Sequence, residues 1–175
     1  MTPGALSNLI PAVLAYFHGE RQEMLSILGA SAVVAAAVAA LFLTMRDGFA
    51  KGLMITTLVC AAVLSASAVS LLARDRTLSQ SIVSAMEGTA ATTVVEKEQS
   101  RIAAVIANYP LYRWAAVLVG IVALLLLVLV RQHWLHGVAA GLLLLVVAQV
   151  VIDRYSEARA ASYLEQISRL SKVRT

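Results

Sequence analysis

Four long stretches of the chain are almost free of charged side chains, and short polar stretches separate them. Residues 24–45 and 52–73 each run for 22 residues without a formal charge, and residues 134–152 run for 19. In residues 112–130, Arg113 is followed by 17 uncharged residues, 12 of which are Leu, Ile or Val. A helix of about 20 residues crosses a hydrocarbon layer of about 30 Å. The pattern therefore predicts four transmembrane helices.

The composition of the whole chain agrees with a membrane protein. Of its 175 residues, 60% are hydrophobic and only 14% are charged, and the mean hydropathy is +0.82. These values lie outside the range that is usual for the amino-acid composition of soluble proteins. Cys60 is the only cysteine, which excludes an intramolecular disulfide and a zinc site built from several cysteines.

The polar segments differ in length and in positive charge. Residues 46–51 and 131–133 are tight turns of 9 residues together, whereas the other side, counted as residues 1–23, 74–113 and 153–175, holds 86 residues and 11 of the 14 Lys and Arg. Cytoplasmic segments carry the excess of Lys and Arg. We therefore expect a multi-pass protein of the cell inner membrane whose two termini and long connector, residues 74–111, face the cytoplasm.

The first arm of this connector has a helical apolar stripe. Leu78, Ile82 and then Ala85 or Met86 recur at helical spacing, and the stripe ends near Gly88. The small and polar residues 88–93 are typical of a turn. We expect a helix that continues the second span into the cytoplasm.

The second arm has a helix-start signal followed by its own stripe. Thr93 and Glu96 match a capping box, which predicts that a helix begins near residue 94. Ile102, Ile106 and Tyr109 then follow at helical spacing. The connector is therefore predicted to be a helical hairpin.

The two terminal segments are also amphipathic. In the tail, residues 153–175, Tyr163 and Ile167 lie one turn apart. The N-terminal segment, residues 1–23, has a similar stripe, but Pro11 restricts where its helix begins; it either lies flat in the interface or covers the helices. The sequence predicts an all-α integral membrane protein in which residues 24–152 form an antiparallel four-helix bundle. Its second, third and fourth helices extend into the cytoplasm as the hairpin and a C-terminal helix.

Small residues mark candidate helix contacts. Gly137 and Gly141 form a GxxxG pattern, which permits two helices to approach closely. In the second span, Ala62, Ala66 and Ser70 repeat every four residues, and the first span has a similar Ala repeat. We expect the first two spans to pack as a hairpin through these repeats, and Gly137 and Gly141 to pack within the chain.

Charges gather at the predicted cytoplasmic membrane surface. The cluster consists of Arg74, Asp75, Arg76, Asp153 and Arg154. Paired across the hairpin, these residues would fix the register of the helices, and most such clusters are structural. Because the basic residues lack an aromatic platform, the sequence argues against nucleic-acid binding and favours contact with anionic membrane lipid.

The sequence gives little support for catalysis, cofactors or metals. No catalytic motif and no acidic residue lies inside a span. His133 and His136 have only Asp47 as a possible third ligand, so we expect no metal, no haem and no small-molecule substrate. An enzyme acting at the membrane surface through residues such as Asp75, Glu96 or Asp153 is a minor alternative.

The function expected from these patterns is binding rather than chemistry. We expect a non-enzymatic accessory or binding protein, such as a toxin-immunity protein or a subunit of a secretion or envelope complex, that holds a protein partner or a second copy of itself. The expected contact residues are the apolar positions of the cytoplasmic helices: Ile82, Met86, Ile102, Ile106, Tyr163 and Ile167. The alternative is a small oligomeric channel or transporter subunit, favoured by the GxxxG pattern of the fourth span and by the second span, which is the most polar because of Thr56, Thr57, Ser65, Ser67 and Ser70.

Overall fold

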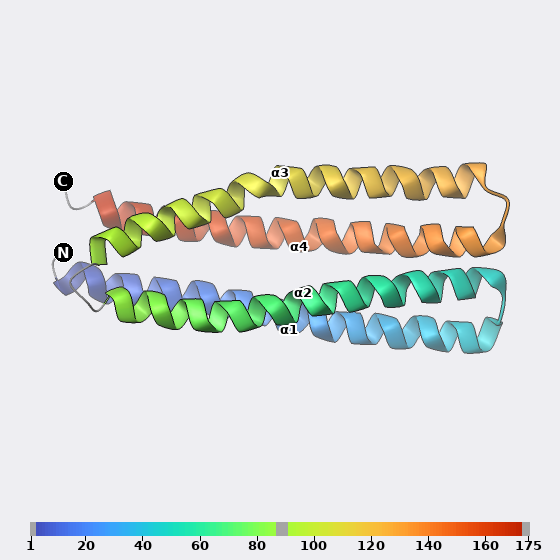
Figure 1. The fold of residues 1–175 in the computed structure, drawn as a ribbon, viewed down its shortest axis with the longest axis horizontal. Helices are drawn as coiled ribbons and strands as arrows, with labels where there is room; N and C mark the ends of the chain where they lie inside the picture. The colour runs from blue at the N-terminus through green and yellow to red at the C-terminus, as the bar shows by residue number, and fades with distance from the viewer. Residues whose placement is uncertain (1–2, 87–90, 173–175) are drawn as a thin grey trace. The chain divides into compact units, whose positions relative to one another are not determined.

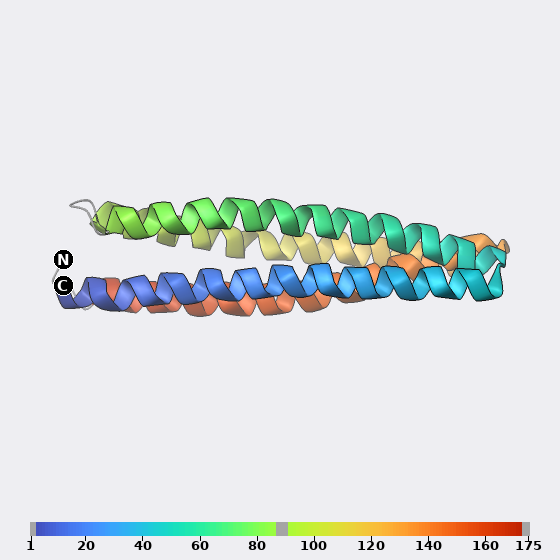
Figure 2. The same cartoon turned by 90° about the horizontal axis from the view of Figure 1, so that it is seen from below.

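Four long helices account for the fold. The computed structural model describes residues 3–86 and 91–172, and side chains within residues 9–86 and 93–169. The helices are α1 (Pro3–Met45), α2 (Gly48–Met86), α3 (Ala91–Leu129) and α4 (His133–Lys172) (Figures 1 and 2). Each contains a segment long and apolar enough to cross a membrane. The prediction of an all-helical chain with four helices able to span a membrane is confirmed.

Short connections close the two turns that lie between the apolar runs. Arg46 has a φ of 50°, a left-handed conformation that ends α1, and its N–H donates to the carbonyl of Phe42 at 2.9 Å. Asp47 Oδ1 then accepts from the N–H of Ala50 at 2.7 Å and so caps α2. After α3, a ring nitrogen of His136 lies 2.6 Å from the carbonyl oxygen of Val130. Asp47 and His136 therefore have local structural roles.

Helix boundaries differ from the sequence predictions at two places. The N-terminal segment is not a separate element, because α1 runs without a break through Pro11 into the first span. A proline inside a helix costs about 3 kcal/mol, but the flanking Leu9 and Val13 are completely buried, and packing of this kind outweighs that cost. Helix α3 begins at Ala91, not near residue 94; part of the predicted turn lies outside the described residues.

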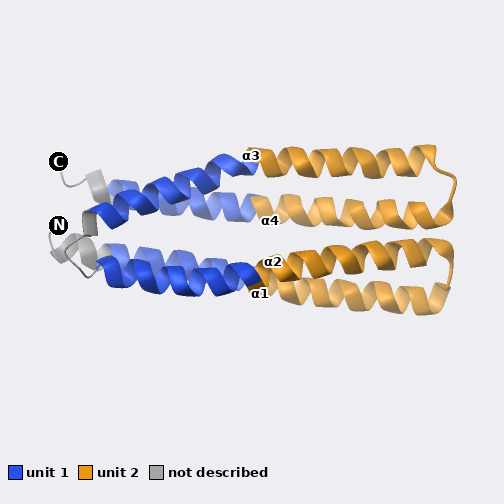
Figure 3. Cartoon of the chain, in the orientation of Figure 1, with its two compact units in different colours: residues 1–24, 70–109, 154–175 blue, residues 25–69, 110–153 orange. Residues whose placement is uncertain are grey.

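The chain divides into two compact units (Figure 3). Unit 1 comprises residues 1–24, 70–109 and 154–175, and unit 2 comprises residues 25–69 and 110–153. Each of the four helices contributes to both units. The sequence predicted long extensions beyond the spans for the second to fourth helices. Helix α1 also has a long segment outside its predicted span.

Unit 1 has a core of large apolar side chains drawn from all four helices. The buried members are Leu9, Val13, Tyr16, Phe17, Ile82, Met86, Val95, Ile102, Ala160, Tyr163 and Ile167. Leu9, Met86, Ile102 and Ile167 are completely inaccessible to solvent. An interior of this kind is what a water-facing helical bundle has, since burying large apolar side chains drives its folding.

Unit 2 shows the opposite arrangement, with apolar side chains on its outside. Among the described residues, every exposed large hydrophobic side chain lies in unit 2, except Leu14 and Tyr155. Within the most apolar window of each helix, only 6% to 17% of the residues are buried. The helices present their Leu, Val and Ile side chains outward, as helices in contact with lipid do.

The helices of unit 2 meet through glycine. A Cβ atom placed on Gly52 would lie 1.9 Å from the carbonyl oxygen of Trp134, and one on Gly137 would lie 2.0 Å from that of Phe49. Further along, a Cβ on Gly141 would lie 2.9 Å from the Cβ of Thr56. No larger residue fits at Gly52 or Gly137, so the backbones of α2 and α4 approach closely here, as in GxxxG contacts between membrane helices.

Candidate functional site

Acidic side chains occupy core positions in unit 1. On α1, Leu9, Val13, Tyr16, Glu20 and Glu23 follow one another at alternating spacings of four and three residues. This spacing places residues on one face of a helix. The face that buries Leu9 and Val13 therefore also turns two carboxyl groups toward the other helices, where burial without a partner is costly.

An arginine of α4 satisfies part of this charge. Arg159 forms an ion pair with Glu23, and its Nη2 lies 4.0 Å from Glu20 Oε1, a second and longer ion pair. Its Nη1 donates to the carbonyl oxygen of Gly19 at 3.4 Å. Ser156, one turn earlier on α4, donates a hydrogen bond to Glu23. These contacts join α1 to α4 inside unit 1.

A fully buried carboxyl group lies on α3. Glu98 is only 3% exposed. Its oxygens accept from Arg101 at 2.8 and 2.7 Å, and from the hydroxyl of Tyr163 at 3.3 Å. The Arg101 guanidinium also lies 5.8 Å from the ring centre of Phe17, within reach of a cation–π contact. This group is thus balanced in charge and links α3 to α1 and α4.

Tyrosines connect the charged groups. The ring of Tyr16 stacks on that of Tyr163, with centroids 4.2 Å apart, and its hydroxyl donates to Glu20 at 2.7 Å. Burial, followed by the charge of Glu20, raises the pKa of Tyr16 far above its usual value. Burial raises the pKa of Tyr109, which is hydrogen-bonded to Ser156, to about 12. Both hydroxyls therefore stay neutral at physiological pH.

A buried carboxyl group of α2, that of Asp75, influences Glu20 of α1. Arg74 donates to Asp75 Oδ1 through Nη2 at 2.9 Å and Nε at 3.0 Å. Burial, followed by the influence of Asp75, raises the pKa of Glu20 to about 7. We name the set formed by Tyr16, Glu20, Glu23, Asp75 and Arg159 the carboxyl cluster.

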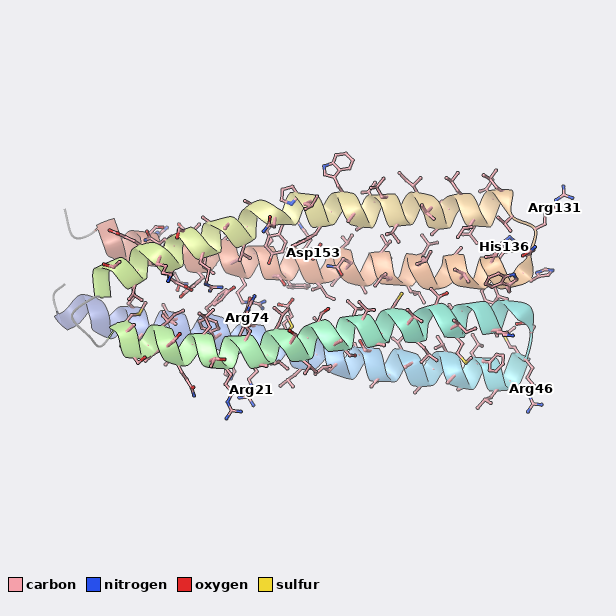
Figure 4. The ribbon with its side chains drawn as sticks, in the orientation of Figure 1. Arg21, Arg46, Arg74, Arg131, His136 and Asp153 are labelled. Carbon is pink, nitrogen blue, oxygen red and sulfur yellow. The ribbon has the colours of Figure 1, made fainter. Side chains whose placement is uncertain are left out.

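The charge cluster predicted from the sequence is only partly brought together. Arg74 and Asp75 form an ion pair, while Arg76 and Arg154 are exposed. Asp153 belongs to unit 2 and accepts from Gln149 at 2.7 Å. Figure 4 labels Arg74 and Asp153 among the side chains. The partners observed for Asp75 were not those expected across the hairpin.

The apolar residues predicted to contact a partner lie in the core of unit 1. Five of them are buried: Ile82, Met86, Ile102, Tyr163 and Ile167. The sixth, Ile106, is half-buried and packs against the same core. In this conformation their contacts are with other helices of the same chain, so a partner role for them stays a prediction that would require unit 1 to open.

The residues predicted to pack helices fall into two groups. Gly137 and Gly141 are buried, and the atoms nearest to a Cβ placed on either belong to α2. The side chains of Ala62, Ala66 and Ser70 are exposed instead, so that face of α2 is not used for packing within the chain. The helix uses the face of Ala50, Leu53 and Thr57, which are buried.

Sequence reasoning missed three glutamates of unit 1, Glu20, Glu23 and Glu98, and one glycine, Gly52. The sequence feature that indicates burial of Glu20, Glu23 and Glu98 is their position, since each lies at the helical spacing that continues a stripe of apolar core residues. The signal for Gly52 was its four-residue spacing from Gly48, which matches that of Gly137 and Gly141. The position of the glutamates competes with the ordinary expectation that charged side chains face water.

Neither the described side chains nor the comparisons with other proteins indicate a metal site or a family. Across residues 9–86 and 93–169, no three His, Cys, Asp or Glu side chains gather as metal ligands do. The chain matches no protein-family model, and comparisons with curated proteins and with solved structures find no similar protein.

Proposed function

We propose that the chain is a non-enzymatic, multi-pass protein of the inner membrane that binds a partner protein through unit 1. The contrast between the two units carries this proposal: unit 2 has apolar side chains outside and fits lipid, whereas unit 1 has a closed apolar core and a polar exterior. A protein of this kind presents a water-facing surface that is fixed to a membrane.

An antiparallel arrangement of the helices is supported by the order of contacts. In unit 1, Tyr16 stacks on Tyr163 and Glu23 contacts Ser156, so positions rise along α1 as they fall along α4. In unit 2, Gly137 approaches Phe49, and Gly141 approaches Thr56, so α2 and α4 run the same way. Alternating up and down helices have both properties.

The placement of unit 1 in the cytoplasm follows from the cations. The side of the chain that includes unit 1 carries 11 of the 14 Lys and Arg, and cytoplasmic segments are the cation-rich ones. Single cysteines at the exposed positions Ser84 and Gln166, placed in a Cys60→Ser background, test this. Both should resist a membrane-impermeant maleimide in intact cells and react after lysis. Labelling in intact cells would reverse the topology.

The polar exterior of α2 in unit 1 is the surface that we assign to the partner. Gln80 and Ser84 are exposed there, and the Ser84 hydroxyl donates to the carbonyl of Ser81 in its own helix. Between Thr77 and Met86 this helix has no charged residue. A face with no net charge and satisfied hydroxyls loses little hydration free energy when a partner covers it.

Two variants of the same helix separate binding by unit 1 from binding by the spans. Gln80→Lys with Ser84→Lys charges the outer face of unit 1, and Ala62→Leu with Ala66→Leu enlarges the exposed face of α2 in unit 2. We expect a cross-linked partner to be recovered with the wild type and the span variant and lost with the lysine variant. The reverse result moves the binding site into the membrane, and equal recovery with both variants contradicts both sites. Unchanged thermal unfolding serves as the folding control.

A channel or transporter subunit is the second candidate, and one observation favours it. The hydroxyl of Thr57 is buried in unit 2 without a hydrogen-bond partner, and a buried polar group of this kind needs a partner such as a water molecule or an ion. Thr56 and Thr57, however, lie against Gly141. Ion flux into liposomes containing the purified protein, abolished by Thr57→Val, supports this function; liposomes that stay silent contradict it.

A further inference from the structure

Unit 1 carries exposed arginines at the end where its helices continue into the spans. Arg21 on α1, Arg76 on α2 and Arg154 on α4 are exposed there, and Figure 4 shows Arg21 pointing away from the ribbon. The ion pairs among the described side chains do not include these three arginines. We call this end the span end of unit 1; it comprises residues 20–24, 70–76, 102–109 and 154–159.

The carboxyl groups of the span end are covered, unlike the arginines. Four described residues carry them, none of which is exposed: Glu20, Glu23, Asp75 and Glu157. Arg159 forms ion pairs with Glu23 and, at 4.0 Å, with Glu20, and Arg74 pairs with Asp75 at 2.9 Å. Residues 102–109 of α3 carry no charge. The outer surface of the span end therefore shows positive charge and no exposed carboxyl group among its described side chains.

The opposite end of unit 1 has charges of both signs on its surface. Glu96 and Lys97 are exposed neighbours on α3, and Arg169 pairs with Glu165 on the exposed side of α4. Interspersed charges of both signs are typical of a surface that faces water. A surface with charge of one sign instead attracts one of the opposite sign. The difference within unit 1 therefore indicates that the span end meets an anionic surface.

The positions of the three arginines along their helices match the depth of lipid headgroups. At a rise of 1.5 Å per residue, Arg21, Arg76 and Arg154 lie about 6, 10 and 2 Å from the first residue of unit 2 on the same helix. The headgroup layer is about 5 to 8 Å deep on each side of the hydrocarbon, and a long arginine side chain bends toward it. Tyr155, beside Arg154, is 71% exposed, and aromatic rings of this kind prefer the same layer.

We propose that Arg21, Arg76 and Arg154 bind the phosphate groups of anionic phospholipids, with one headgroup at each of the three helices. A guanidinium group offers a planar pair of N–H donors that matches two phosphate oxygens. A zwitterionic lipid presents the same phosphate together with a cationic amine, so it is attracted less strongly. This lipid site rests on the proposed placement of unit 2 in a bilayer, and it does not involve the partner protein.

Lipid binding to the full-length protein in neutral detergent micelles tests the proposal. The probes are short-chain phosphatidylglycerol, short-chain phosphatidylcholine and inorganic phosphate, each titrated by calorimetry. The wild type should bind phosphatidylglycerol most tightly, and added salt should weaken this binding because it screens exposed charges. Equal affinity for phosphatidylcholine would remove the role of the anionic charge, and equal affinity for inorganic phosphate would make a free anion the ligand. Either result overturns the proposal.

Two double variants that remove equal charge locate the site. Arg76→Gln with Arg154→Gln removes two cations from the span end, and Lys97→Gln with Arg169→Gln removes two exposed cations from the opposite end. One arginine near an anionic membrane surface changes the affinity about fivefold, so the span-end variant should bind phosphatidylglycerol about twenty-five-fold more weakly. The control variant should stay within about twofold of the wild type. Equal losses in both would mean that only total charge matters, and they would contradict the site, as would unchanged binding by the span-end variant.

A single variant covers the case in which the span-end variant does not fold. Arg21→Gln changes an exposed side chain on a third helix and should weaken phosphatidylglycerol binding about fivefold; unchanged binding contradicts the site. Thermal unfolding without lipid should match the wild type for each variant. Recovery of a cross-linked partner is measured on the same variants, and it should persist when lipid binding is lost. Because the partner test depends on Gln80 and Ser84, failure of the lipid site and failure of the proposed function are distinguishable.

Discussion

Units 1 and 2 are built from the same four helices, yet they bury different kinds of residue. The interior of unit 1 holds large side chains such as Met86 and Ile102, together with paired charges. In unit 2, the closest approach of α2 to α4 is made by Gly52 and Gly137, and the large side chains face outward. In water, exclusion of apolar area drives packing. In lipid that drive is missing, so close backbone contact takes its place.

A matched pair of isoleucines tests this difference most strongly. Ile102 is completely buried in unit 1, whereas Ile121 is 48% exposed in unit 2. Ile102→Ala should lower the free energy of unfolding by about 2 to 5 kcal/mol, because it leaves a cavity. Ile121→Ala should change it by less than about 0.5 kcal/mol, since that side chain faces lipid before and after unfolding. Chemical unfolding in micelles measures both; equal effects would erase the distinction between the units.

A matched pair of glycines sharpens the other half of the comparison. A Cβ on Gly137 would meet the backbone at 2.0 Å, whereas one on Gly29 has nothing within 4 Å. Gly137→Ala should destabilise the protein by about 1 to 3 kcal/mol through overpacking. Gly29→Ala should be neutral or slightly stabilising, because Ala favours the helix. Thermal unfolding and resistance to protease report the effect, and a harmless Gly137→Ala would mean that the glycine contact is absent.

A matched pair of tyrosines gives the smallest expected effect. Tyr163 is buried and donates to Glu98, while Tyr155 is 71% exposed. Tyr163→Phe removes one hydrogen bond in the unit 1 core and should cost about 0.5 to 1.5 kcal/mol. Tyr155→Phe should leave the free energy of unfolding unchanged. If both variants behave alike, the polar contacts in unit 1 contribute nothing measurable to stability.

The number and class of the helices were predictable, because the length of an uncharged run is a direct consequence of bilayer thickness. The extent of α1 was not, since Pro11 argues locally for a break, and only the packing of Leu9 and Val13 in the unit 1 core reveals why the helix continues. Local propensity is a weak guide where tertiary contacts are strong.

The carboxyl cluster was only partly predictable for a similar reason. Asp75 was recognised as a surface charge, but Glu20 was not singled out. Its contact with Arg159 of α4 depends on which faces of α1 and α4 meet, and the two residues lie far apart in sequence. The alternating phase of Glu20 and Glu23 along α1 was visible in the sequence, and a charge that continues an apolar stripe is the feature that indicates a buried titratable group.

The contacts of α4 have a consequence for how the chain is made. In unit 1 the apolar core residues of α1 are covered by Tyr163 and Ile167 of α4, and in unit 2 the glycine contact of α2 is completed by α4. During synthesis, α1 and α2 leave the ribosome well before α4 exists. The apolar face that α1 contributes to the core of unit 1 therefore stays incompletely covered until the last helix has been synthesised.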